Sequence, residues 1–229
     1  MFEIEIKKSL KILEEYGITL KDGMSEEEIL SAEKYYGLNF PLDFRAFLMA
    51  ALPFDNDFDD NNCWCNFTNW RNLSEEYVNN IKSKMFDWTI DGVLYTAEYL
   101  GGWCDDWGVQ PETMEEKAET VKAMVKEKPL FIPITANKFL ALGDYSDNAV
   151  YSIHDGIDVI CYGKNIWDFI EKYFLYNGNK TVDLEAIKEP FPKYNEFVYH
   201  SINNFFYQGR KYYDKHGNYI GGNKPELLE

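Results

Sequence analysis

Three aspartates have the alternating spacing of a calcium-binding loop. Asp55, Asp57 and Asp59 stand at the first, third and fifth positions, from which alternate oxygens could converge on one ion. The sixth position is Asp60 instead of the glycine that the sharp turn needs, and the twelfth is Asn66 instead of a bidentate glutamate. The pattern therefore favours a solvated acidic loop that can dock a cationic partner over a bound metal ion.

Cysteine is the second residue type that could do chemistry. Cys63 and Cys65 form one tight pair, while Cys104 and Cys161 stand singly, whereas a structural zinc site usually takes its thiolates from two closely spaced pairs. A disulfide between Cys63 and Cys65 would be strained. We therefore expect thiols that pack as small apolar groups, and we expect neither zinc nor another cofactor.

Catalytic machinery is sparse in this sequence. The three histidines are His154, His200 and His216, and the chain contains no nucleophile-elbow, P-loop or zinc-protease motif. A nucleophilic pair of Cys104 and His154 stays open as an alternative, because the sequence does not show which residues meet in space. We expect a protein that is not an enzyme, with a small-molecule hydrolase using Cys104 or a carboxylate pair as the alternative.

Two tryptophans flank two aspartates in the segment from Trp103 to Trp107. Tryptophan often anchors interfaces, and carboxylates such as Asp105 and Asp106 can hold an arginine through two parallel hydrogen bonds. The segment is therefore either a contact surface or a pair of aromatic plugs at a sheet edge. Charge favours the contact surface, because residues 53–119 contain four basic and fifteen acidic side chains, a net charge of −11.

The whole chain carries a net charge of −16 at pH 7, and it contains no run of basic residues. Nucleic acids and anionic membranes both require a cationic footprint, so we expect neither as a partner. A basic protein partner is favoured because complementary fields steer encounter, although an acidic surface also serves to keep a protein in solution. These patterns do not define an oligomeric state.

The sequence also bears on the compartment. The N-terminal residues 1–8 begin acidic and amphipathic, unlike a signal peptide, and no apolar run approaches the length of a membrane-spanning helix. Four cysteines without an export signal are typical of reduced thiols. We therefore expect a cytoplasmic protein.

Capping residues predict most of the helices. An amphipathic helix over residues 2–16 can end at Gly17, a capping box of Ser25 and Glu28 opens a second helix that stops at Gly37, and a third runs from Pro41 to Pro53. Two further predictions are a helix through Met85 followed by a hairpin at Asp91–Gly92, and a helix opened by Thr113 and Glu116. The last helix covers residues 165–174, with Asn165 as its N-cap.

Four short strands precede that last helix. Residues 131–135, 139–142, 149–153 and 157–162 are rich in β-branched and aromatic residues and are separated by turn residues. A meander followed by an amphipathic helix is typical of a sheet with one face covered. The predicted class is α+β, with a central, mostly antiparallel sheet that carries packed helices, an N-terminal helix and a C-terminal extension.

Several segments, taken in order, resemble the SUKH superfamily of Smi/Knr-like proteins. The first are Glu28–Ile29, Ala32–Glu33, Gly37 and residues 40–48, in which Phe40 replaces the leucine that usually precedes the proline. Later segments that match in the same order are residues 131–134, 142–144, 150–155 and 167–170. The resemblance covers roughly residues 25–175 and implies an α+β domain that binds other proteins.

The resemblance also implies a function. Bacterial members are commonly immunity proteins that neutralise toxin domains, often nucleases, and fungal members regulate cell-wall synthesis; no catalytic residue set carries over. We therefore expect an immunity protein in which Asp57, Asp59, Asp60, Asp105 and Asp106 pair with a basic toxin while Trp103 and Trp107 anchor the contact. A regulatory scaffold protein is the alternative in the same class. The expected organisation is a helix and linker (1–24), a SUKH-like domain (25–175) and an extension (176–229).

Overall fold

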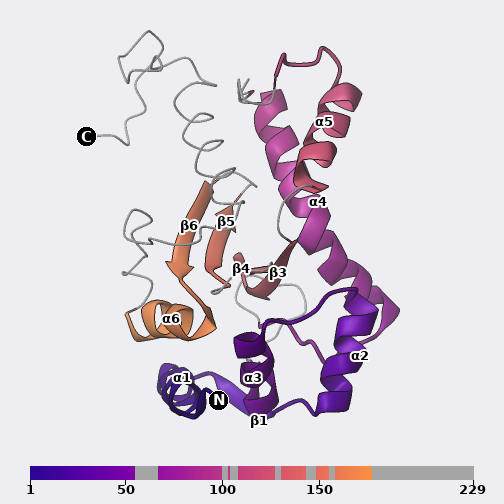
Figure 1. Cartoon of the computed structure of the whole chain (residues 1–229). Coiled ribbons are helices and arrows are strands. Elements are labelled where there is room, and N and C mark those ends of the chain that lie inside the picture. The colour runs from indigo at the N-terminus through magenta and orange to yellow at the C-terminus, as the bar shows by residue number, and fades with distance from the viewer. Residues whose placement is uncertain are drawn as a thin grey trace, which may run out of the picture. The chain divides into compact units, whose positions relative to one another are not determined.

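A computed structural model of the chain describes residues 1–54, 67–99, 103, 108–126, 130–142, 148–154 and 158–176 (Figure 1). The described residues divide into two compact units. Unit 1 begins with Met1–Phe86 and includes the described parts of Pro129–Ile153 and Ile160–Pro190. Unit 2 includes the described parts of Asp87–Lys128 and His154–Val159.

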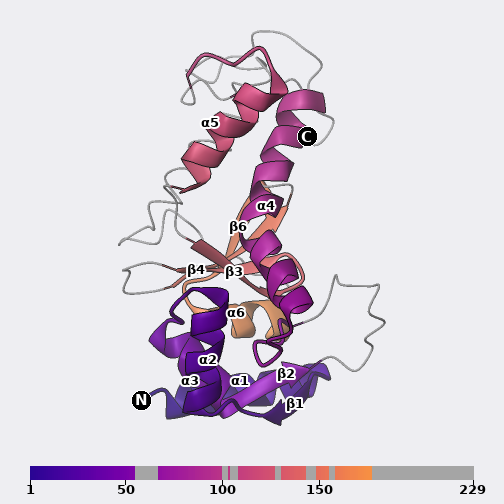
Figure 2. The ribbon, with the colours of Figure 1, turned by 90° about the vertical axis from the view of Figure 1, so that its right-hand side faces the viewer.

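Unit 1 opens with the predicted amphipathic helix, α1 (Glu3–Tyr16), which buries Ile12 and Leu13. It ends at Gly17, whose φ of 98° is a left-handed conformation that favours glycine, so the predicted stop is confirmed. The chain then forms β1 (Thr19–Asp22), which pairs antiparallel with β2 (Ala51–Phe54). Figure 2 shows this two-stranded sheet beside α1. Residues 1–24 thus lie in the same compact unit as the helices that follow.

The second helix, α2 (Glu26–Tyr36), has the predicted capping box. The backbone N–H of Glu28 donates to the Ser25 hydroxyl at 3.2 Å, and the backbone N–H of Ser25 donates to the Glu28 carboxylate at 2.8 Å. The helix ends at Gly37, with a φ of 72°. Both ends of α2 are therefore set by the local sequence, as predicted.

The third helix, α3 (Leu42–Ala50), is shorter than predicted. Pro41 is its N-cap instead of its first helical residue, and the helix ends at Ala50 instead of running to Pro53. Ala51 has an extended backbone (φ −160°, ψ 153°) and begins β2, in which it pairs with Asp22. Pairing with a distant strand therefore outweighs continuation of the helix. Pro53 is compatible with that strand because, among the described residues, β1 and β2 pair only with each other, and proline is tolerated on an edge strand.

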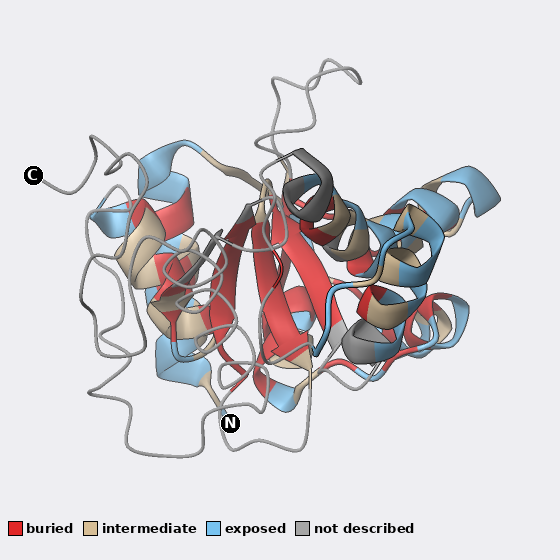
Figure 3. Cartoon of the chain, turned by 90° about the horizontal axis from the view of Figure 1, so that it is seen from above, coloured by how far each residue is buried: buried red, intermediate tan, exposed pale blue. Residues whose placement is uncertain are grey.

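The main sheet is the predicted meander. Its strands are β3 (Leu130–Thr135), β4 (Lys138–Leu142), β5 (Val150–His154) and β6 (Asp158–Gly163), in the order β3-β4-β5-β6. The β3–β4 and β4–β5 pairs are antiparallel. Figure 3 shows that most strand residues of this sheet whose burial is described are buried, whereas the helices expose one face. These helices and sheets confirm the predicted α+β class.

Helix α6 (Ile166–Ile170) follows the sheet and continues as a π-helical segment, η2 (Glu171–Leu175). Asn165 is the N-cap, as predicted, and accepts a hydrogen bond from the backbone N–H of Asp168 at 3.0 Å. Ile166, Phe169 and Ile170 are fully buried. The segment therefore packs its apolar face into the core of unit 1.

The hairpin predicted at Asp91–Gly92 is wrong. A single helix, α4 (Glu75–Tyr99), runs through this position, and Gly92 is buried within it. Buried residues continue at helical spacing from Val78 through Ile81 and Met85 to Gly92, so packing outweighs the turn preference of Asp-Gly. A glycine inside a helix costs only about 1 kcal/mol relative to alanine, which side-chain burial offsets.

Unit 2 contains the part of α4 from Asp87 onward and helix α5 (Met114–Lys126). Helix α5 begins with the predicted capping box of Thr113 and Glu116. The backbone N–H of Glu116 donates to the Thr113 hydroxyl at 3.2 Å, and the Thr113 N–H donates to the Glu116 carboxylate at 3.4 Å. None of the described helices is both long and apolar enough to cross a membrane.

Candidate partner-binding surfaces

The structure describes one of the residues predicted to contact a partner, Trp103. This side chain is only 6% exposed, and its indole N–H donates to the carbonyl of Gly108 at 3.0 Å. The ring therefore presents little surface to a partner in this structure. The other predicted contact residues lie outside the described residues: Asp57, Asp59, Asp60, Asp105, Asp106 and Trp107.

Helix α5 carries exposed carboxylates from the acidic third of the chain. Glu112, just before the helix, and Glu115, Glu116 and Glu119 within it are all exposed. Lys122 forms an ion pair with Glu119 at 3.2 Å, and both side chains stay largely in solvent. This part of the acidic region is therefore a solvated surface, and its charges can attract a cationic partner.

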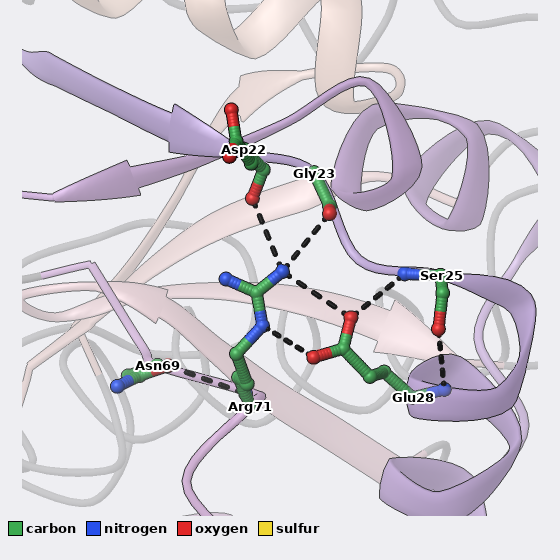
Figure 4. A network of polar contacts seen from close by, with 6 residues as sticks. All are labelled: Asp22, Gly23, Ser25, Glu28, Asn69 and Arg71. Carbon is green, nitrogen blue, oxygen red and sulfur yellow. Dashed lines mark hydrogen bonds and ion pairs between the residues drawn. The ribbon is translucent and has the colours of Figure 1, made fainter.

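Arg71 joins α2 to the turn before it in unit 1 (Figure 4). Its Nε donates to Glu28 Oε1 at 2.7 Å, and its Nη2 donates to Glu28 Oε2 at 3.2 Å. The same Nη2 donates to the carbonyls of Asp22 (3.1 Å) and Gly23 (2.9 Å). The hydrogen bond from Arg71, then that from the Ser25 backbone, lowers the pKa of Glu28 below its usual range. The two hydrogen bonds from Arg71 to the two oxygens of Glu28 have the bidentate geometry that arginine forms with carboxylates.

Arg45 makes a second network, between α3 and α2. Its Nη1 donates to both carboxylate oxygens of Glu33 at 3.2 Å, and its Nη2 pairs with Glu26. Glu33 is buried, with 9% of its side chain exposed, and its Oε1 also accepts the backbone N–H of Phe40 at 2.9 Å. The Glu33 carboxylate thus binds both the backbone of the segment that connects α2 to α3, at Phe40, and the side chain of Arg45.

An aromatic cluster lies under the same connection. Trp70 is 1% exposed, and its ring centroid lies 5.0 Å from that of Tyr36, 5.1 Å from Phe40 and 6.4 Å from Phe44, all in edge-to-face contact. Such pairs add to the stabilisation that burial alone provides. The segments within residues 28–48 that resemble SUKH proteins therefore contain many residues that stabilise the fold. The buried ones are not accessible to a partner.

Sequence reasoning did not predict two other features of unit 1. Lys138 is 5% exposed, and its Nζ donates to Asn137 Oδ1 at 2.5 Å and to Ser152 Oγ at 3.4 Å. The same Nζ lies 5.0 Å from the ring centre of Tyr162 and 4.9 Å from that of Tyr173, so cation–π attraction helps to hold it. The second feature is exposed apolar side chains on α2 and α3, with Leu42 74% exposed.

Among the cysteines, the structure describes Cys161, which is buried. Burial raises the pKa of the Cys161 thiol to about 12, so this sulfur is not a nucleophile near neutral pH. Cys63, Cys65 and Cys104 lie outside the described residues, as do Asp55, Asn66, His200 and His216, and of His154 only the backbone in β5 is described. Within the described part of the chain, no group of three or more histidine, cysteine, aspartate or glutamate residues could hold a metal ion.

Comparison of the chain with family models, with curated proteins and with solved structures finds no match. The resemblance to SUKH proteins therefore depends on the ordered motif segments of this sequence. The described residues form helices and a meander closed by a helix, which shows the α+β class.

Proposed function

We propose that this protein is a cytoplasmic binding protein that neutralises a basic toxin domain by stoichiometric contact, as bacterial immunity proteins of the SUKH type do. The observation that carries the proposal is the acidic third of the chain, in which residues 53–119 have a net charge of −11. The carboxylates at the start of α5 supply part of this charge, and they are exposed. A solvated single-sign surface accelerates association with a partner of opposite charge.

The proposed mechanism is occlusion. Asp57, Asp59, Asp60, Asp105 and Asp106 would hold lysines and arginines of the toxin, because a nuclease domain uses such residues to bind phosphate. Blocking them requires one inhibitor molecule for each toxin molecule. In this mechanism the contact weakens as salt rises, since screening acts most strongly on exposed charges.

The test is capture from the lysate and the secreted fraction of the source cells on immobilised protein, with washes at low and then high salt. We expect one basic protein that is retained at low salt and released at high salt, and whose toxicity is suppressed by co-expression. Its gene should lie beside the gene for this chain. Recovery of endogenous enzymes alone, without a toxin gene nearby, would favour the regulatory scaffold instead.

Two matched double variants test which carboxylates contact the captured protein. Reversal of Asp105 and Asp106 to lysine should lower the affinity for the captured protein, because two predicted arginine partners are lost. Reversal of Glu5 and Glu14, two exposed glutamates on α1, changes the net charge by the same amount and should have a smaller effect. Equal effects of the two double variants would contradict the proposed contact residues.

A further inference from the structure

Three large non-aromatic apolar side chains, besides Tyr35, are exposed on α2 and α3. Leu30 on α2 is 52% exposed, while Leu42 and Met49 on α3 are 74% and 43% exposed. We call these three residues the α2–α3 face. An exposed apolar surface of this kind marks a contact site when its members are contiguous and when polar residues surround it.

The Arg45 network shows that the members of the α2–α3 face surround one ion pair. Glu26, Leu30 and Glu33 are spaced by four and three residues and therefore lie along one row of α2, with Leu30 between the two carboxylates that Arg45 contacts. Leu42, Arg45 and Met49 are spaced by three and four residues and lie along one row of α3. The apolar side chains thus flank the same guanidinium.

A shallow hollow of about 420 Å³ adjoins this face. It is lined by Leu30, Glu33, Lys34, Gly37, Leu38 and Asn39. Gly37 has no side chain to fill it, and a Cβ built at this position would meet no atom within 4 Å. The hollow therefore offers room for a side chain of a partner beside the exposed Leu30.

Charge indicates the chemistry of that partner. Glu28 and Glu33 are held by arginines and Asp43 is buried, so the acidic side chains of residues 22–49 that a partner can reach are Asp22, Glu26 and Glu27. The exposed basic side chain of this region, Lys34, lines the hollow. Glu26 and Glu27 extend the first turn of α2 into solvent, next to the α2–α3 face. A cationic partner is favoured here and an anionic one is disfavoured.

We propose that the α2–α3 face binds an amphipathic segment of a partner protein, one whose apolar side chains lie next to lysine or arginine. The apolar side chains contact Leu30, Leu42 and Met49, and the cations lie beside Glu26 and Glu27. This inference rests on the proposed function, that of a protein that binds a basic protein. It adds a contact in unit 1 to those predicted in the acidic third of the chain.

The test uses two synthetic amphipathic helices of about 18 residues, or five turns, with the same leucines and with either lysine or glutamate at every polar position. We expect the lysine peptide to bind and to shift the methyl NMR signals of Leu30, Leu42 and Met49. The double variant Leu30→Gln/Leu42→Ser in the full chain should weaken binding about tenfold or more, since each buried leucine contributes that much.

The matched control is Ile4→Ser. Ile4 is 82% exposed and lies in the first turn of α1, as Leu42 lies in the first turn of α3. This variant should bind the lysine peptide as the unmodified protein does. Circular dichroism of each variant checks that the fold is kept, which both substitutions allow because the altered side chains are exposed.

Several outcomes overturn the inference: absence of peptide binding, equal binding by the double variant and the control, or equal binding of the glutamate peptide. Self-association that the double variant abolishes, without peptide binding, would assign the face to a second copy of the chain. A captured toxin that is insensitive to the double variant but sensitive to the Asp105 and Asp106 reversals overturns this inference alone. Peptide binding at this face without any basic toxin overturns the immunity function alone.

Discussion

Residues 26–45 and residues 112–122 are both rich in glutamate, yet their carboxylates lie in different surroundings. In the first region Glu33 is 9% exposed and is held by Arg45 and by the backbone of Phe40. In the second region Glu119 is 77% exposed, and its partner Lys122 is 47% exposed. The difference separates charges that position helices from charges that are available to a partner.

This comparison shows why net charge alone does not locate a binding surface. Ion pairs that are partly buried contribute to the fold only if both members stay, whereas exposed pairs contribute little to stability and can exchange partners. The acidic excess matters for binding only where the carboxylates are exposed, as they are in α5 and at Glu26 and Glu27 in the first turn of α2. Stability measurements on single variants can therefore test the assignment of each region.

The largest effect is expected for Arg45→Ala. The substitution leaves the buried Glu33 without its cation, and we expect a loss of about 2–3 kcal/mol in the free energy of unfolding, somewhat below the cost of breaking a fully buried pair. Urea unfolding followed by tryptophan fluorescence measures it. Glu26→Gln, which alters the exposed member of the same network, is the control and should cost far less; similar losses for the two variants would contradict the comparison.

A smaller loss, of about 1–2 kcal/mol, is expected for Arg71→Ala. The variant loses the bidentate contact to Glu28 and the hydrogen bonds to the carbonyls of Asp22 and Gly23. Lysine at this position keeps the charge but not the planar fork, so Arg71→Lys should recover only part of the loss. Full recovery in the same urea assay would show that charge, not geometry, stabilises the turn.

The pH dependence of Glu28 gives a third test. Its pKa is lower in the folded protein than the ordinary 4.5, so its contribution to stability is present above that pH and is lost as pH falls through the folded pKa. Because Glu28 is 39% exposed, Glu28→Gln should cost less than about 1 kcal/mol at pH 7. Urea unfolding of both proteins should show this difference shrink between pH 6 and pH 3; a constant difference would exclude the ion pair as its cause.

The smallest effect is expected in α5. Lys122→Ala removes an exposed ion pair with Glu119 and should change the midpoint of thermal unfolding by an amount equivalent to about 0.5 kcal/mol or less. Lys122→Arg, which keeps the charge, serves as the reference. A loss above 1 kcal/mol would mean that the carboxylates of α5 are structural as well, and it would remove the contrast with α2 and α3.

Local signals in the sequence predicted the starts of α2, α5 and α6, because a cap depends on residues three or four apart. Ser25 with Glu28, Thr113 with Glu116, and Asn165 all act as predicted. The β1–β2 pair was not predicted, since each strand has four residues and the partners Thr19 and Phe54 lie far apart in the chain. Residues 88–99 were misassigned because Asp-Gly is a strong turn signal, and only tertiary packing reveals that Gly92 is buried in a helix.

The candidate surfaces were predictable only in part. Composition revealed the acidic third of the chain, and the structure places the described acids of α5 in solvent. The α2–α3 face was not predictable, because its definition depends on Arg45 reaching from one helix to two carboxylates on another. Single residues such as Leu30 and Leu42 fit either a core or a surface when only the sequence is read.

The enclosure of Lys138 by Tyr162 and Tyr173 has a practical consequence. An amine that is 5% exposed is shielded from acylating reagents, whereas Lys122, which is 47% exposed, reacts freely. The rate at which Lys138 is labelled therefore records how often the sheet and its closing helix separate. Mass spectrometry of this one lysine after acylation therefore measures the rate of local opening in the core of unit 1, and it can be done in a mixture of proteins.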